Sequence, residues 1–169
     1  TIEKFLGDFK GTLMTDAYAA YAFFSKLKDC THVCCWAHAR RIFVSALRDY
    51  KDELAREFIE LIKLLYKVEL ENIFFHRTEQ EVVKARKDEA IPILSQLLQK
   101  ATGLLKMSDS RQVTISEKLH QALKYMTNNW QELYGYVNIG NVLIDNNCCY
   151  PNFSFIPTFG GSYYKRLVA

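Results

Sequence analysis

The sequence lacks any hydrophobic run near the ~18 residues that a membrane-spanning helix needs, and no basic-then-apolar leader opens the chain. A strong charge of either sign is also lacking. The net charge of +3 is too small to indicate nucleic-acid binding by itself. Cysteines are few and odd in number, five in two clusters, which excludes a disulfide framework. We therefore expect a cytoplasmic protein with no membrane partner.

The composition that remains is that of an ordinary globular protein. Hydrophobic residues make up 49% of the chain and charged residues 24%, which argues against disorder. A length of 169 residues is enough for one domain, or for a domain with an insertion. The chain begins with Thr1 rather than Met, so we expect it to be the later part of something longer.

Residues 1–36 read as strand, helix, strand. "TLMTD" (12–16) is a short apolar strand, "AYAAYAFFSKL" (17–27) a helix of small and aromatic residues, and "THVCCW" (31–36) a second strand of β-forming residues. We expect the two strands to be adjacent in one small sheet, with the helix packed on it.

Residues 37–134 read as almost entirely helical. A buried face at helical spacing is predicted in the first helix, with a polar face opposite it, and Pro92 suits the first turn of a later helix. "TISEKLHQALKYMTNNWQEL" begins with a predicted capping box, Thr114 with Glu117. The expected buried residues are Phe43, Ala46, Leu47 and Tyr50; Leu54, Phe58, Leu61, Leu65 and Val68; and Ile115, Leu119, Ala122, Leu123, Met126, Trp130 and Leu133.

Residues 135–147 are expected to return toward the sheet, and residues 148–169 form an atypical tail. The tail has no acidic residue, although the first 147 residues hold all 19, and it has two of the three prolines and six aromatics. It shows neither a helical nor a strand period, and Pro151, Pro157 and Gly160-Gly161 oppose a regular helix. We expect it to be loosely packed.

Asp16 is the first candidate site residue. A carboxylate at the tip of a strand is held rigidly and suits metal binding, but an isolated Asp before a helix is more often an N-cap. In "VLIDNN" (142–147), Asp145 ends an apolar run, which by itself indicates a turn or an N-cap.

Two further groups carry possible chemistry. Cys30, His32, Cys34, Cys35 and His38 lie close together, but their spacing matches no familiar zinc finger, and buried small hydrophobes are the commoner role for such cysteines. Arg40, Arg41 and Arg48 form a short basic patch, which is more often a solvated helix face than a phosphate contact.

Taken in order, "LMTDAYAAY", "CCWAHARRIF", "ALKYMTNNWQELYGYV" and "VLIDNN" resemble the transposases of the insertion sequence 66 family of bacterial mobile elements. The resemblance covers residues 10 to 147. It implies part of an RNase H-like sheet, two strands and a helix, with a large all-helical insertion, so the expected fold class is an α/β fragment. Its domains would be a partial catalytic core at 1–36, a helical insertion at 37–134, a return at 135–147 and the tail.

The resemblance also implies a site. Asp16 matches the second acid of the family's DDE triad, which uses magnesium for DNA cleavage and strand transfer. His38, Arg40, Arg41 and Arg48 would contact DNA, and further transposase chains are implied partners. The first acid lies outside this chain, and the third, a glutamate, falls on position 150, which is Tyr. We therefore expect a truncated or decayed transposase that is inactive alone, its tail the product of a frameshift near codon 147, and no tightly bound metal.

Two other classes of protein fit the same residues. One is a non-catalytic helical module that binds DNA or protein. The other is a structural helical domain in which Asp16 and Asp145 are caps.

Overall fold

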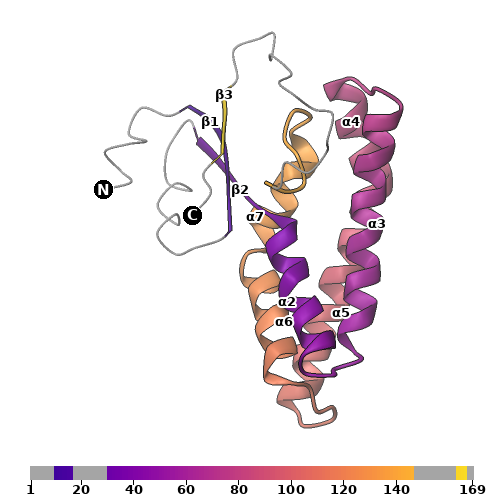
Figure 1. Ribbon diagram of the computed structural model, residues 1–169, viewed down its shortest axis with the longest axis vertical. Coiled ribbons are helices and arrows are strands. Elements are labelled where there is room, and N and C mark those ends of the chain that lie inside the picture. Colours follow the sequence, from indigo (N-terminus) through magenta and orange to yellow (C-terminus); the bar gives the residue numbers. More distant parts are fainter. Residues whose placement is uncertain (1–9, 17–29, 147–162, 167–169) are drawn as a thin grey trace.

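A computed structural model of the protein describes residues 10–16, 30–146 and 163–166 (Figure 1). Within these ranges a small parallel sheet adjoins a larger group of helices. None of the described helices combines the length and the apolar character needed to cross a membrane. The strands are β1 (Gly11–Thr15), β2 (Cys30–Cys34) and β3 (Tyr163–Arg166). The helices are α2 (Trp36–Arg48), α3 (Ala55–Phe74), α4 (Glu79–Ala85), the π-helix η2 (Arg86–Ala90), α5 (Ile91–Asp109), α6 (Glu117–Asn128), α7 (Trp130–Tyr134) and the 3₁₀-helix η3 (Gly135–Asn138).

The sheet has the order β2-β1-β3, and both pairings are parallel. β1 pairs with β2 from Gly11↔Cys30 to Thr15↔Cys34, which confirms the prediction that these two strands are adjacent. Both strands begin one residue earlier than predicted. The central strand buries Leu13 and Met14 completely. The predicted helix at 17–27 lies outside the described residues.

The tail supplies the third strand. β3 pairs with β1 from Gly11↔Tyr163 to Met14↔Arg166. These four residues form a strand although the tail shows no strand period in its sequence. Parallel pairing joins segments that are far apart in sequence, so this strand could not be predicted from local periodicity. The expectation of loose packing covers residues 148–169, most of which lie outside the described residues.

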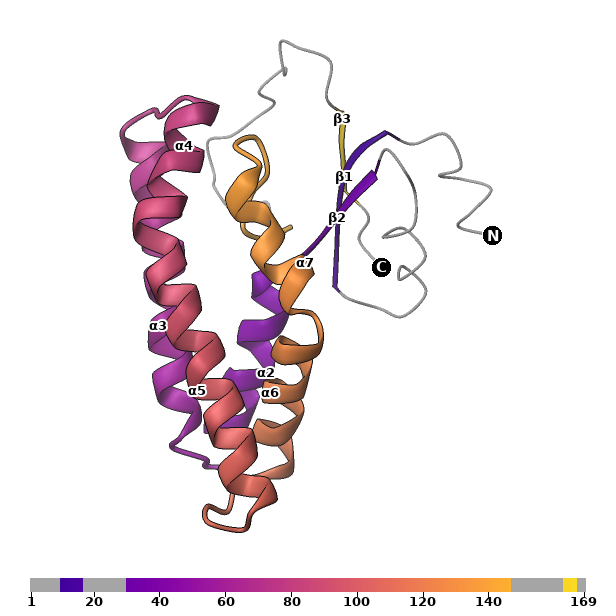
Figure 2. The ribbon, with the colours of Figure 1, turned by 180° about the vertical axis from the view of Figure 1, so that it is seen from behind.

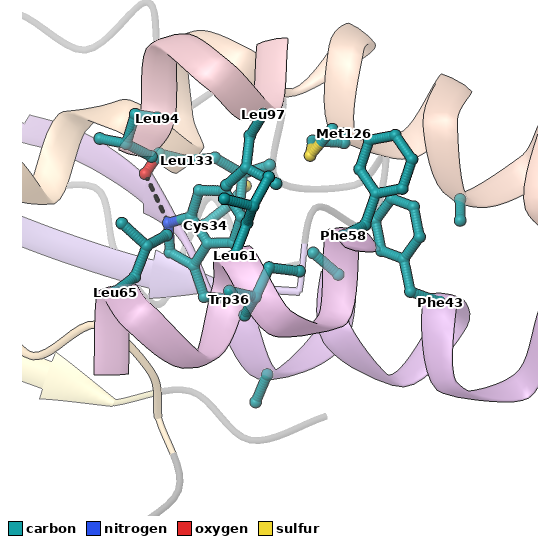
Figure 3. Close-up of a cluster of buried hydrophobic side chains, with 14 of the residues drawn as sticks. Cys34, Trp36, Phe43, Phe58, Leu61, Leu65, Leu94, Leu97, Met126 and Leu133 are labelled. Carbon is teal, nitrogen blue, oxygen red and sulfur yellow. Dashed lines mark hydrogen bonds between the residues drawn. The ribbon is translucent and has the colours of Figure 1, made fainter. Parts of the chain in front are cut away.

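α2 leaves the carboxyl end of β2 and enters the helical region, where it packs against α3 and α6 (Figures 1 and 2). Figure 3 shows the core between these helices. The Phe43 and Phe58 rings stack with their centroids 4.9 Å apart, and the buried Trp36 indole donates a 2.9 Å hydrogen bond to the carbonyl of Leu133. One contiguous core thus links the start of α2 to the final helices.

Most of the predicted buried faces are confirmed. The buried members include Phe43, Ala46, Phe58, Leu61, Leu65, Val68, Leu119, Ala122, Leu123, Met126 and Leu133. Tyr50 and Leu54 are instead exposed, because α2 ends at Arg48 and the chain turns through Lys51 at a φ of 55°. Pro92 lies in the first turn of α5, as predicted.

The predicted capping box at Thr114 is wrong. The N-cap of α6 is Ser116, whose hydroxyl accepts a hydrogen bond from the amide of Leu119, and whose own amide donates to the Asp52 carboxylate at 2.7 Å. A capping box does occur at the start of α4, between Thr78 and Glu81.

Residues 139–146 follow η3 and run back to the sheet. Arg86 holds the first part of this segment to the helices, since its guanidinium donates to the carbonyls of Tyr136, Ile139 and Val142 at 2.7 to 2.8 Å. The later part reaches the junction between β2 and α2, which is where the candidate site lies.

Candidate functional site

Three segments meet at the carboxyl end of the sheet. The amide of Cys35, one residue after β2, donates to the carbonyl of Thr15 at the end of β1 (2.9 Å). The next amide, that of Trp36, donates to the carbonyl of Ile144 (3.2 Å). Asp16 and Asp145 follow Thr15 and Ile144 directly, so both acids lie beside the β2–α2 junction.

Cys35 reinforces this meeting point. Its thiol donates to the side-chain oxygen of Asn146 (3.1 Å), and the amide of Asn146 lies 3.5 Å from the sulfur as a donor. Burial raises the pKa of Cys35, and burial raises the pKa of Cys34 to about 12. Both therefore remain thiols at neutral pH and can donate hydrogen bonds.

The burial of Cys34 and Cys35 in the core confirms the prediction that they are small buried hydrophobes; Cys30 is partly exposed. Zinc binds the thiolate form of cysteine. In the ranges that the structure describes, no group of three His, Cys, Asp or Glu side chains could hold a metal ion. The zinc alternative thus has no support from these residues.

Asp16 is held on its main chain, and its side chain lies close to His38. The Tyr125 hydroxyl, from α6, donates to the Asp16 carbonyl at 3.0 Å. The Asp16 Oδ2 lies 3.8 Å from Nε2 of His38, in the first turn of α2, and about 30% of each of these two side chains remains exposed. The main chain of Asp16 is therefore held in place, and its carboxylate is accessible. The N-cap alternative concerns a helix outside the described residues.

His38 is neutral at physiological pH. Burial and then the nearby Arg41 lower the pKa of His38, and Asp16 opposes them with a smaller effect. Arg41 Nη2 lies 3.5 Å from His38 Nε2, and because a guanidinium only donates, Nε2 accepts this weak contact. His38 Nδ1 is buried with no hydrogen-bond partner among the described atoms.

Asp145 is held by the helical region. The Tyr66 hydroxyl, from α3, donates to Asp145 Oδ2 at 2.7 Å. Burial, and then this hydrogen bond, raise the pKa of Tyr66, so the phenol remains protonated. The positive charge of Arg40 has a smaller effect that lowers the pKa of Tyr66.

Only two of the three arginines of the predicted basic patch lie close together in the structure. Arg40 and Arg41 lie in the first turns of α2, where Arg41 contacts His38 beside Asp16. Arg48 is seven residues beyond Arg41, roughly 11 Å at the rise of an α-helix. There it is exposed and forms a 2.8 Å ion pair with Asp49. Arg48 is therefore not part of the group around Asp16.

The fit to magnesium can be judged from the donors present. Magnesium prefers oxygen ligands, keeps several waters and can be held by one or two carboxylates. The accessible Asp16 carboxylate fits one such hydrated ion. It does not fit a two-metal centre, since the described residues contain no cluster of three acidic or imidazole ligands.

Two residues at this end of the sheet were not predicted from the sequence to belong to the site. Tyr66 and Tyr125 are 79 and 109 residues away from their partners Asp145 and Asp16. Tyr125 did carry a signal, because it belongs to the "ALKY" string of the family resemblance. Tyr66 sits in an ordinary amphipathic helix and carried none.

Comparison with known proteins gives two matches. The model of a family described as "Transposase IS66 family" matches residues 1–149. "Uncharacterized protein y4jD" of Sinorhizobium fredii (strain NBRC 101917 / NGR234) is 24% identical over 151 residues. That alignment covers 86% of this chain but 28% of the relative, so the chain spans under a third of the relative's length. No solved structure matches.

Proposed function

The chain belongs to the IS66 transposase family, and from this premise we propose that it is a later part of a DDE catalytic domain with Asp16 as the second acid. The domain would be RNase H-like, with a partial core at 1–36, a helical insertion at 37–134, a return at 135–147 and the tail at 148–169. Its proposed location is the cytoplasm, and its proposed partners are the DNA of the element and further transposase chains.

One observation carries this proposal. The segments with the three motifs of the resemblance, "TDAY", "CWAHARR" and "IDNN", meet at the carboxyl end of one parallel sheet through the hydrogen bonds of Cys35 and Trp36. Ligands bind at that end of the strands in open parallel sheets. Motifs that had only a structural role would have no reason to converge on an accessible carboxylate.

Catalysis by the chain alone is not part of the proposal. When bound, magnesium ions supply the activation of a nucleophile and the stabilisation of a leaving oxygen in such phosphodiester chemistry. Asp16 would hold one ion weakly. The family match ends at residue 149, and the position expected for the glutamate is Tyr150. We propose that a frameshift replaced the glutamate-bearing segment with the tail.

What this chain's residues can do is bind DNA near Asp16. His38, Arg40 and Arg41 line the first turns of α2, and Arg41 is exposed. Guanidinium groups form strong charge-assisted hydrogen bonds with phosphate. Arg48 would contact the DNA backbone further along α2. The incomplete set of acids also favours the second candidate, a module that binds DNA without cutting it.

A mobility-shift titration at several salt concentrations tests the DNA contacts. Arg40→Ala, Arg41→Ala and Arg48→Ala should each weaken binding and reduce the slope of log K against log salt by roughly one. Arg56→Ala is the matched control, because Arg56 is an exposed helical arginine paired with Glu53 on α3. Equal effects of Arg41→Ala and Arg56→Ala would contradict the DNA-binding surface.

A nicking assay with magnesium or manganese tests the catalytic part. We expect no metal-dependent cleavage of supercoiled DNA by the isolated chain. Cleavage that disappears in Asp16→Asn would mean that the chain completes an active site with acids beyond those described here.

A further inference from the structure

The tyrosine on α6 occupies an unusual place relative to Asp16. Parallel pairing between β1 and β2 ends at Thr15, whose carbonyl accepts the amide of Cys35. The next carbonyl, that of Asp16, therefore lies just beyond the ladder. The hydroxyl of Tyr125 donates to it at 3.0 Å, across 109 residues of sequence.

This contact restrains the backbone that carries the Asp16 side chain. A hydrogen bond to the carbonyl restrains the peptide plane that follows Asp16, and hence its ψ angle and the orientation of the residue. Because the hydroxyl engages the main chain, it does not compete for the carboxylate oxygens. The imidazole of His38 approaches the same residue from α2, with its Nε2 3.8 Å from Oδ2.

We propose that Tyr125 is a positioning residue for Asp16: the helical region aims the acid through this hydroxyl. The proposal rests on the proposed role of Asp16 as the acid that holds a divalent cation. In this proposal the helical region positions a residue of the site, in addition to any contact that it makes with DNA.

The helix that carries Tyr125 is rigidly placed. α6 packs along α2, and Leu119, Ala122, Leu123 and Met126 on its inner face are all buried. Burial, followed by the neighbouring Cys34, Cys35 and Asp16, raises the pKa of Tyr125 well above its usual range. The phenol thus remains a donor at all physiological pH values.

A second tyrosine hydroxyl from the helical region forms a hydrogen bond at the same end of the sheet. Tyr66 of α3 donates to Asp145 on the return segment. The two contacts differ in kind, because Tyr66 binds a carboxylate and Tyr125 binds a main-chain carbonyl. Only Tyr125 can orient an acid without occupying it.

The test uses Mn²⁺ as a paramagnetic probe of the 169-residue chain. Its binding is followed by the broadening of the amide NMR signals of Thr15, Cys35 and His38. Tyr125→Phe keeps the ring and removes the hydroxyl, and we expect the Mn²⁺ concentration for half-broadening to rise roughly three- to ten-fold. Tyr136→Phe is the matched control, since the buried Tyr136 hydroxyl has no hydrogen-bond partner among the described atoms; it should bind Mn²⁺ as the wild type does.

Asp16→Asn separates this inference from the function on which it rests. If Asp16→Asn leaves the broadening unchanged, the cation does not bind Asp16, and the proposed role of the acid is wrong. If Asp16→Asn abolishes the broadening but Tyr125→Phe binds as the wild type does, the acid has its proposed role and Tyr125 does not position it.

A measurement on the wild type makes the outcome independent of how well Tyr125→Phe folds. Adding Mg²⁺ should move the ¹³C resonance of the Asp16 carbonyl and the hydroxyl proton resonance of Tyr125 over the same concentration range. A shift of the Asp16 carboxyl resonance with both of these signals unmoved would overturn the proposal.

Discussion

Arg86 forms a bidentate ion pair with Glu69 in the interior of the helical region, with N···O distances of 2.8 and 2.5 Å. The Arg86 and Glu69 side chains are 2% and 7% exposed, so almost no water reaches the pair. The guanidinium also lies 4.9 Å from the centroid of the Tyr136 ring. Together with its three carbonyl partners, Arg86 joins α3 to the segment that leads back to the candidate site.

Arg86→Met should therefore lower the free energy of unfolding by ~3–5 kcal/mol, because it leaves the Glu69 carboxylate buried without a counter-charge. Urea denaturation measures the change. The double variant Arg86→Met/Glu69→Leu should recover part of the loss, since it removes the stranded charge. Arg56→Met, which breaks an exposed pair with Glu53, should change stability by less than ~1 kcal/mol. A small effect of Arg86→Met would mean that water reaches the pair in solution.

Tyr66→Phe should detach Asp145 from the helical region. A hydrogen bond to a charged group contributes ~1.5–3 kcal/mol, and since the bond is only partly buried we expect a loss near the lower end. In a double-mutant cycle with Asp145→Asn, the two effects should be less than additive. Tyr136→Phe, which removes a buried hydroxyl with no partner among the described atoms, should be neutral or stabilising. Full additivity would show that the Tyr66–Asp145 contact contributes nothing to stability.

Local patterns predicted much of this fold. The apolar and β-forming residues in 12–16 and 31–36 identified two strands, and the spacing of Leu119, Leu123 and Met126 identified the buried face of α6. These patterns depend on neighbours within a few residues, so a single sequence contains them. The return of residues 135–147 toward the sheet came only from the family resemblance, not from a local pattern.

Contacts between distant residues could not be predicted. Arg86 lies in "KARKDEA", where it resembles any solvated helical charge until its partners 17 to 56 residues away are known. The N-cap of α6 is a similar case. Thr114 and Ser116 have similar local signals, and the carboxylate of Asp52, 64 residues earlier, holds the amide of Ser116. Tertiary contacts determine both the buried position of Arg86 and the residue at which α6 begins.

Buried thiols should make the protein sensitive to alkali. Burial, and then the nearby Glu132, raise the pKa of Cys34 from its usual 9.0 to about 12. A raised pKa stabilises the folded state fully below pH 9, and this contribution is lost as the pH rises toward 12. Each such thiol should reduce the free energy of unfolding by ~1.4 kcal/mol per pH unit in that window. Burial raises the pKa of Cys35 in the same direction.

Urea denaturation at pH 8 and pH 10 checks this prediction, because the buried tyrosines contribute only above the usual tyrosine pKa. Cys34→Val keeps an apolar side chain of similar size on β2 and should make the decrease between the two pH values less steep. A decrease as steep as that of the wild type would exclude Cys34 as its source.

Two glycines should respond in opposite directions to replacement by alanine. A Cβ on Gly140 would lie 2.3 Å from the carbonyl oxygen of Glu79, at the start of α4, whereas a Cβ on Gly103, within α5, would meet nothing within 4 Å. Backbone atoms cannot rotate away, so Gly140→Ala should force α4 and the return segment apart and cost ~1–3 kcal/mol. Gly103→Ala should instead stabilise the protein by ~0.5–1 kcal/mol, because alanine loses less conformational entropy in a helix. Urea denaturation of both variants measures the difference. Stabilisation by Gly140→Ala would mean that the return segment does not contact α4 in solution.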